Sequence, residues 1–288
     1  MTPSLTEEVL PAGDDAELMA LRVQRRARRE RLLRTLVPAL ALACVLLAWE
    51  AVVRINDIPN YIIPAPSLVL QTLVQQWSSL WPSLMFTLKL TFSGLALAVI
   101  GGVLFAAAFA LSRWVEVALF PFAVVLQVTP VVAIAPLILI YVESTFSALL
   151  ICAWLVAFFP ILSNTVIGLR SADHNLKDLF LLYRTTPWQR LRFLLVPSAL
   201  PYFLAGLKIA GGLSLIGAVV AEFVAGTAGA ETGLASRILE ASFRNEIPRM
   251  FAALVLISLC GVAIFLLFNW LSRLLLSKWH DSEIRSES

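Results

Sequence analysis

Six long apolar runs limit what this chain can fold into. They occupy residues 36–53, 84–111, 120–141, 146–169, 199–225 and 251–271, and a helix needs about 20 apolar residues to cross the hydrocarbon core of a bilayer. Hydrophobic residues make up 59% of the 288 positions and charged residues only 14%, whereas about 25% of a soluble domain is charged. The sequence therefore predicts an all-α polytopic membrane protein with six transmembrane helices.

The positive charges are distributed unequally between the two sides that these helices would create. With the N-terminus inside, sixteen Lys and Arg residues fall on the inner side and four outside, at positions 54, 237, 244 and 249. Because basic residues concentrate on the cytoplasmic side of membrane proteins, both termini are predicted to be cytoplasmic. We expect a basic tail at 1–35, a membrane domain at 36–271 and a C-terminal tail at 272–288. Nucleic-acid binding is disfavoured, since no soluble fold and no interleaved aromatic residues accompany the charges.

The N-terminal region is polar before it becomes basic. Residues 1–24 are expected to be disordered, and residues 25–34 can form a basic helix on the inner leaflet. A cleaved signal peptide at 36–53 is the alternative to a first span. It is disfavoured because the basic region is too long and more apolar residues follow Cys44 where a cleavage site should end the run.

Residues typical of catalysis or metal binding are scarce and scattered. Cys44, Cys152 and Cys260 each lie inside an apolar run, without a second thiol at ligand spacing. His174 and His280 fall in segments expected to be cytoplasmic and solvated. The sequence predicts neither a metal site nor a cofactor. The motifs G-x-x-x-x-G-K-[ST], H-E-x-x-H and G-x-S-x-G are absent from it, so the chain is not expected to be an enzyme.

A polar, basic stretch lies between the fourth and fifth runs. It begins after Arg170 and carries Arg184, Arg190 and Arg192 before Pro197. Its apolar residues recur at helical spacing, which predicts short amphipathic helices and not a loose linker. These residues are Leu179, Phe180, Leu182, Tyr183, Leu191, Phe193, Leu194 and Val196. An apolar surface of this kind, exposed to water, requires a partner.

This stretch resembles the loop that marks the membrane subunits of ATP-binding-cassette (ABC) importers. The pattern of that loop is Glu-Ala-Ala, three residues, Gly, nine residues, then Ile-x-Leu-Pro. Pro197 stands at the proline of the pattern, Leu194 and Val196 at the Ile and Leu, and Asp178 at the Glu. Only the proline is identical. Arg184 stands where the pattern has Gly, and its effect on the turn is left open.

The segment after the loop is a closer match to one branch of this family than the loop itself is to the pattern. This branch carries nitrate, taurine, alkanesulfonates or thiamine-precursor pyrimidines. The matching segment is residues 197–226, PSALPYFLAGLKIAGGLSLIGAVVAEFVAG. Together with Thr-Pro-Trp-Gln at 186–189, the resemblance covers roughly residue 60 to the C-terminus. It implies the type I importer fold, with a cytoplasmic coupling helix between helices 4 and 5, in a bacterial inner membrane. It also implies three kinds of partner: a second permease copy, a dimer of ATP-binding subunits and a periplasmic substrate-binding protein.

The resemblance assigns the ATPase contact and its lever to the stretch between the fourth and fifth runs. In this interpretation, closure of the ATP-binding subunits moves the loop, and its prolines pass the motion to the fifth span. The expected residues are Asp178, Tyr183, Arg184, Thr185, Thr186, Pro187, Trp188, Gln189, Pro197 and Pro201.

Polar residues inside the spans are the candidates for a translocation pathway, because they are costly in lipid and must find partners or water. The third run offers Gln127, Thr129 and Pro130, the fourth Asn164, and the fifth Ser214 and Glu222. Interhelical bonding is an equally favoured role for Gln127 and Asn164. Glu222 is expected to face water or a cation, either as a functional gate or in a structural ion pair. The glycines of the fifth run leave room for another helix, expected to be the same helix of a second copy.

Residues 233–249 are expected to form an amphipathic helix on the outer side. Its predicted apolar face is Leu234, Ile238, Leu239 and Phe243, and its predicted exposed charges are Arg237, Glu240, Arg244 and Glu246. Docking of a partner and simple solvation are both open roles for these charges. The cargo is expected to be a small organic or anionic nutrient, with pyrimidine-like compounds slightly favoured. An ion-coupled secondary carrier and a non-transporting scaffold are the alternatives.

Overall fold

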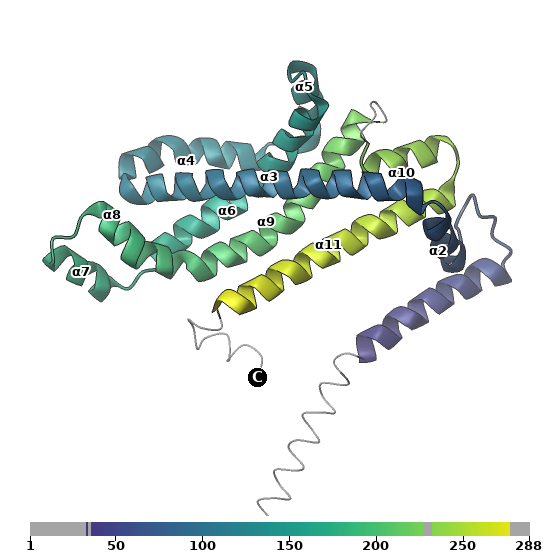
Figure 1. Cartoon of the computed structure of the whole chain (residues 1–288), viewed down its shortest axis with the longest axis horizontal. Helices are drawn as coiled ribbons and strands as arrows, with labels where there is room; N and C mark the ends of the chain where they lie inside the picture. The colour runs from purple at the N-terminus through teal and green to yellow at the C-terminus, as the bar shows by residue number, and fades with distance from the viewer. Residues whose placement is uncertain (1–32, 34–35, 227–231, 277–288) are drawn as a thin grey trace, which may run out of the picture. The chain divides into compact units, whose positions relative to one another are not determined.

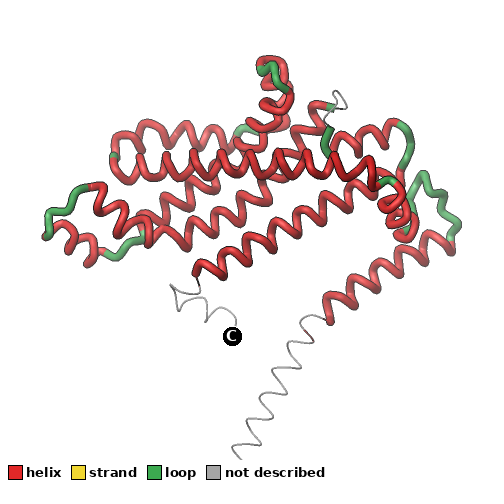
Figure 2. Tube along the Cα trace, viewed as in Figure 1, coloured by secondary structure: helices red, strands yellow, loops and turns green. Residues whose placement is uncertain are grey.

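A computed structural model describes residue 33, residues 36–226 and residues 232–276 (Figure 1). The expected disordered stretch at 1–24 and most of the expected basic helix at 25–34 lie outside these residues, as does the tail after Leu276. The described residues form helices joined by short loops, without a strand (Figure 2). The chain divides into two compact units, Met1–Pro59 with Ala65–Ser67, and Asn60–Pro64 with Leu68–Ser288.

The first unit contains one long apolar helix, Leu36–Ile55, which can cross a membrane. Near the end of this helix, Glu50 accepts hydrogen bonds from the backbone N–H of Ser67, at 3.0 Å, and from its hydroxyl, at 2.7 Å. The same carboxylate pairs with Arg54 one turn later, at 2.5 Å. These contacts tie the end of the helix to the returning chain.

The second unit holds the other membrane helices. Its elements are α2 (Pro66–Gln75, which begins in the first unit), α3 (Trp77–Leu111), α4 (Arg113–Val128), α5 (Val131–Tyr141), α6 (Thr145–Arg170), α7 (His174–Leu182), α8 (Pro187–Arg190), a π-helical turn (Leu191–Leu195), α9 (Val196–Ala225), α10 (Leu234–Phe243) and α11 (Ile247–Leu276). In the described part of the chain, five helices are long and apolar enough to span a membrane, or six if α4 and α5 count as one broken span.

The third predicted span is broken, contrary to the expectation of one continuous helix over 120–141. Helices α4 and α5 are bent by 101° relative to each other. The break lies at Thr129 and Pro130, both of which have extended backbones. Pro130 has no N–H to donate to the Leu126 carbonyl, and its ring disfavours a helical conformation for the residue before it.

Three small residues of α9, Gly206, Gly211 and Ser214, contact other helices of the same chain, whereas Gly212 has open space beside it. A Cβ added at Gly206 would lie 2.8 Å from the Asn164 Cβ of α6, and one at Gly211 would lie 2.5 Å from the Phe268 ring of α11. The Ser214 hydroxyl donates to the Thr91 carbonyl of α3 at 2.8 Å. Gly206, Gly211 and Ser214 were expected to contact a second copy of the chain, and for these three positions that expectation is wrong. Close helix packing within one chain produces the same pattern of small residues.

The short helices gather at two opposite ends of the membrane helices. Helices α7 and α8 lie between the end of α6 and the beginning of α9, whereas α10 lies beyond the other end of α9 (Figure 1). Both ends carry residues singled out from the sequence, and they are called the α7–α8 end and the α10 end below.

Candidate functional site

Arg184 forms the turn between α7 and α8 in a conformation that favours glycine. Its φ is 47°, in the left-handed region. The Arg184 N–H donates to the Leu181 carbonyl at 2.9 Å, and the Thr185 N–H donates to the Phe180 carbonyl at 3.1 Å. This is the Schellman pattern of a helix C-terminus, in which glycine is the usual residue at this position. Arg184 therefore reproduces the turn of the family pattern, at a conformational cost of about 1 kcal/mol or more.

Helix α8 is short, but its start is well defined. Thr186 accepts a hydrogen bond from the Gln189 N–H at 3.3 Å, and the Gln189 side chain accepts one from the Thr186 N–H at 2.8 Å. Pro187 occupies the first turn, where no backbone N–H is needed. This capping box fixes Trp188 on the helix, with its side chain exposed.

The α7–α8 end presents large apolar side chains to its surroundings. Leu182 is 80% exposed, Tyr183 77% and Trp188 63%. Asp178 is also exposed, but it lines a cavity together with Arg190. Of this apolar surface, Tyr183 and Trp188 belong to the predicted contact, whereas Leu182 was predicted only as an apolar residue of the loop. Arg184, Thr186 and Gln189 of the predicted contact are exposed as well.

A continuous helical path joins this surface to α9. In the π-helical turn Leu191–Leu195 that follows α8, the Val196 N–H donates to the Leu191 carbonyl five residues earlier. Leu191, Leu194 and Leu195 are buried against the membrane helices. Pro197 and Pro201 stand in the first turns of α9. No loop residue separates α8, the π-helical turn and α9.

A cavity of about 400 Å³ opens where α4 breaks from α5. Gln127, Thr129 and Pro130, predicted from the third run, all line it. Helices α6 and α9 complete its wall with apolar residues such as Phe159 and Ile216. None of its lining residues is ionisable. The sequence anticipated the polar residues of this cavity but not the bend that creates it.

The other predicted pathway residues lie outside this cavity. The Asn164 side chain donates to the Pro160 carbonyl at 2.8 Å and packs against Gly206. Ser214 is buried against α3. Both side chains therefore bond backbone carbonyls inside the helix bundle, and neither faces the break between α4 and α5.

Glu222 is buried, with 1% of its surface exposed. One carboxylate oxygen accepts from the Thr87 hydroxyl at 2.8 Å, and the other accepts from the Ala235 N–H at 2.9 Å. The Thr87 hydroxyl oxygen in turn accepts from the Leu234 N–H at 2.9 Å. Two free N–H groups at the start of α10 are thereby satisfied by α3 and α9.

The expected role of Glu222 needs correction on this evidence. Water or a cation was the expected partner, but the carboxylate bonds a hydroxyl and a helix N-terminus, which also favours negative charge. A Cβ added at Gly233 would overlap the Glu222 carboxyl group. Thr87 and Gly233 could not be singled out from the sequence, because a threonine and a glycine are common in such segments.

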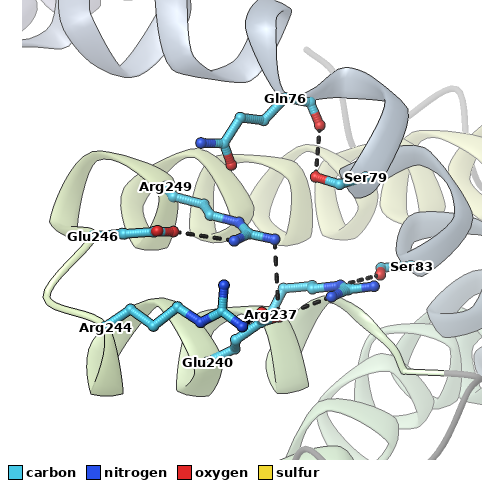
Figure 3. Close-up of polar contacts among 8 residues, drawn as sticks. All are labelled: Gln76, Ser79, Ser83, Arg237, Glu240, Arg244, Glu246 and Arg249. Atoms are coloured by element: carbon cyan, nitrogen blue, oxygen red, sulfur yellow. Dashed lines mark hydrogen bonds and ion pairs between the residues drawn. The ribbon is translucent and has the colours of Figure 1, made fainter.

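The charges of α10 form a cluster, shown in Figure 3. Arg237 donates to the Ser83 hydroxyl at 2.9 Å and pairs with Glu240 at 2.8 Å. Glu240 also pairs with Arg244 at 3.0 Å, and Arg249 pairs with Glu246 at 3.0 Å. The hydrogen bond from Arg237 and the positive charges of Arg249, Arg237 and Arg244 lower the pKa of the Glu240 carboxyl.

The amphipathic helix expected over 233–249 is present as α10, but it ends at Phe243, and residues 247–249 belong to α11. Its two faces also differ from the prediction. Arg237 and Glu240 were expected to be exposed, whereas their side chains are only 27% and 19% exposed. Phe243 was expected on the apolar face and is 80% exposed. The hydrogen bond from Arg237 to Ser83 and the ion pair between Arg249 and Glu240 hold these charged side chains against α3 and α11.

Comparison with known proteins identifies the family. The model of the family described as "Binding-protein-dependent transport system inner membrane component" matches residues 98–279. The riboflavin transport system permease protein of Chloroflexus aurantiacus is 35% identical over 85% of this chain and 92% of that relative. The formylaminopyrimidine transport permease protein of Halalkalibacterium halodurans is 33% identical over 86% of this chain and 97% of that relative.

A solved structure supports the fold. An amino acid ABC transporter with histidines resembles this chain with a TM-score of 0.57 at 18% identity, over 71% of this chain and 96% of the solved one. At that identity the likeness concerns the fold alone. The helices, the loop between α6 and α9 and the family match agree, so the chain belongs to the binding-protein-dependent transport system inner membrane components, the permease subunits of ABC importers, and is not itself an enzyme.

Proposed function

We propose that this permease conducts an uncharged, flat organic nutrient past the break between α4 and α5. ATP-binding subunits would drive this transport by contacting Leu182, Tyr183 and Trp188. The observation that carries the first part is the cavity at the break, whose lining contains no ionisable residue. An inorganic anion would have to leave water without a positive partner there, which is costly. A neutral heterocycle loses much less hydration free energy when it enters the cavity.

The hydrogen-bonding groups at the break suit the same class of cargo. Pro130 cannot donate to the Leu126 carbonyl, so that carbonyl is free to accept from a ligand. The Gln127 side chain is exposed at the cavity and can both donate and accept. Riboflavin and formylaminopyrimidine, for which two relatives are named, are heterocycles that offer donors and acceptors to such groups. A nitrate or sulfonate cargo, which the branch also allows, finds no complementary charge.

A second copy of the chain would complete the wall of this route. The α4 and α5 surface beside the break carries exposed apolar residues, among them Phe122 at 68%, Val125 at 62% and Ile140 at 75%. In a bilayer such residues can pack against lipid or against the apolar surface of another helix. Two copies would enclose the two cavities between them.

The ATP-binding subunits would contact the α7–α8 end, and the substrate-binding protein would deliver cargo at the α10 end. This arrangement places the α7–α8 end in the cytoplasm, in agreement with the basic residues found there. The rigid helical path from α8 into α9 supports the transmission of force.

Cysteine labelling tests this arrangement. In a chain freed of its native cysteines, Thr186→Cys is expected to react with a membrane-impermeant maleimide in inverted vesicles but not in intact cells. Ser242→Cys, which replaces an exposed residue of α10, is expected to show the opposite pattern. Labelling of Thr186→Cys from outside intact cells would reject the proposed direction of coupling.

A transport assay tests the cargo. Vesicles containing the permease with its ATP-binding subunits and binding protein are expected to take up formylaminopyrimidine or riboflavin at least about tenfold faster than nitrate or taurine. Gln127→Ala is expected to slow that uptake several-fold, because the cavity loses its amide. Gln75→Ala, at an exposed glutamine of α2, is the matched control and leaves uptake unchanged. Faster uptake of nitrate or taurine would contradict the proposed class.

A further inference from the structure

A second cavity, of about 420 Å³, lies at the α7–α8 end where α3 and α6 terminate. Its apolar lining comes from Phe109 and Ala110 of α3, Leu169 of α6 and Leu195 of the π-helical turn. Its polar lining comes from the end of α6 and from α7 and α8, and consists of Arg170, His174, Lys177, Asp178 and Arg190. The cavity is therefore apolar on one side and mainly cationic on the other.

The cationic side is not neutralised within the described part of the chain. Arg170 forms an ion pair with Glu116, and the Lys177 ammonium donates to the Arg170 carbonyl at 3.0 Å. The Arg190 side chain is partly buried, and no hydrogen bond or ion pair to its guanidinium occurs among the described residues. Asp178 is the one carboxylate among the lining residues, which also include the cationic side chains of Arg170, Lys177 and Arg190. A partly buried guanidinium without a partner favours the binding of an anion.

A further cavity, of about 290 Å³, adjoins this one and has an apolar surface. Leu169 belongs to the lining of both cavities, and residues such as Val103, Val196 and Phe203 enclose the apolar one. The apolar runs of α3 and α6 end near Leu111 and Leu169 and are followed by Arg113 and Arg170, as expected where a helix reaches the membrane–water interface. An anionic group beside an apolar space at that level matches the chemistry of a phospholipid, whose phosphate is joined to acyl chains.

We propose that this cavity binds an anionic phosphate carried on an apolar tail, namely an acidic phospholipid. Its phosphate contacts Arg190 and Lys177, and an acyl chain lies over Phe109, Ala110 and Leu169. The assignment to the inner leaflet rests on the proposed direction of coupling, but the binding itself does not. The bound lipid fills the space between α7–α8 and the ends of α3 and α6, and thereby supports the surface that Leu182, Tyr183 and Trp188 form.

Lipid retention measured by native mass spectrometry tests this proposal. The full-length permease, purified in detergent and supplied with equal amounts of phosphatidylglycerol and phosphatidylcholine, is expected to retain phosphatidylglycerol preferentially. Arg190→Gln is expected to reduce that preference about tenfold, because it removes the unpaired charge. Arg113→Gln makes the same change of charge at an exposed residue of α4 outside the cavity, and leaves the preference unchanged. Equal preferences in all three proteins would overturn the proposal.

A second variant separates a lipid from a free anion. Ala110→Leu fills the apolar side of the cavity without changing any charge, so it is expected to weaken retention of phosphatidylglycerol at least severalfold. Inorganic phosphate, added as a competitor, is expected to displace little lipid. Displacement by phosphate at low millimolar concentration, together with normal retention by Ala110→Leu, would assign the cavity to a free anion and overturn the lipid. Thr186→Cys labelling and nutrient uptake report on the proposed function independently of these measurements.

Discussion

Replacement of Glu222 by alanine is expected to lower the free energy of unfolding by roughly 3 kcal/mol, because two buried donors lose their acceptor at once. These are the Thr87 hydroxyl and the Ala235 N–H. Glu222→Gln keeps the shape and one acceptor oxygen, and is expected to cost about 1 kcal/mol. Thermal unfolding of the purified chain in detergent, followed by the loss of helical circular dichroism, measures both effects.

The control for this comparison is Glu143→Ala, at an exposed glutamate between α5 and α6. It removes the same group and is expected to leave the melting temperature unchanged. Gly233→Ala tests the same contact from the other side, since its methyl group would overlap the Glu222 carboxyl, and we expect a loss of about 2 kcal/mol. If Glu222→Ala melts like Glu143→Ala, the carboxylate does not hold α10 in place.

Replacement of Trp188 by alanine is expected to weaken the association with the ATP-binding subunits about 30-fold and to uncouple ATP hydrolysis from uptake. An exposed tryptophan at the centre of a contact surface contributes about 2 kcal/mol or more when a partner covers it. The side chain is 63% exposed and touches no core cluster, so the melting temperature of the isolated permease should not change. Reconstituted vesicles that report both ATP hydrolysis and uptake measure the effect.

The matched control is Trp114→Ala, which removes an 83% exposed tryptophan of α4 at the same end of the bundle. Normal coupling is expected for it. Normal coupling in Trp188→Ala would remove the α7–α8 end from the proposed ATPase contact.

Two variants of Arg184 test separately whether coupling needs the turn or the charge, in the same reconstituted vesicles. Arg184→Gly keeps the left-handed turn without the strain of a side chain, and is expected to stabilise the permease by about 1 kcal/mol with coupling retained. Arg184→Glu keeps the strain and reverses the charge, and is expected to uncouple hydrolysis from uptake. Loss of coupling in Arg184→Gly as well would show that the guanidinium itself is required.

The sequence alone determined the membrane spans, the helical stretch between the fourth and fifth runs and the outer helix. Each of these depends on residues that are neighbours in sequence, since apolar length and helical periodicity are local properties. The family resemblance could also be found from the sequence, because the pattern that ends at Pro197 is one contiguous segment. The turn at Arg184 was left open by the sequence, because arginine does not by itself favour the left-handed conformation that the structure shows.

The bend in the third span was not predictable in this way. Pro121 and Pro136 both lie inside helices, whereas Pro130 breaks one. The three prolines look alike in sequence, and which of them interrupts a helix depends on whether neighbouring helices fill the space around it. The cavity between α4, α6 and α9 exists only because of that choice.

Only the tertiary structure decided what the polar and small residues of α9 contact. Thr87 lies 135 positions before Glu222. Gly206 and Gly217 of α9 pack against α6, and Gly211 packs against α11. A buried carboxylate requires a partner, and a glycine permits a close approach of another helix. Neither property identifies which distant residue becomes the partner. That residue is set by how the whole bundle packs, because contacts between distant segments form only once the helices have assembled.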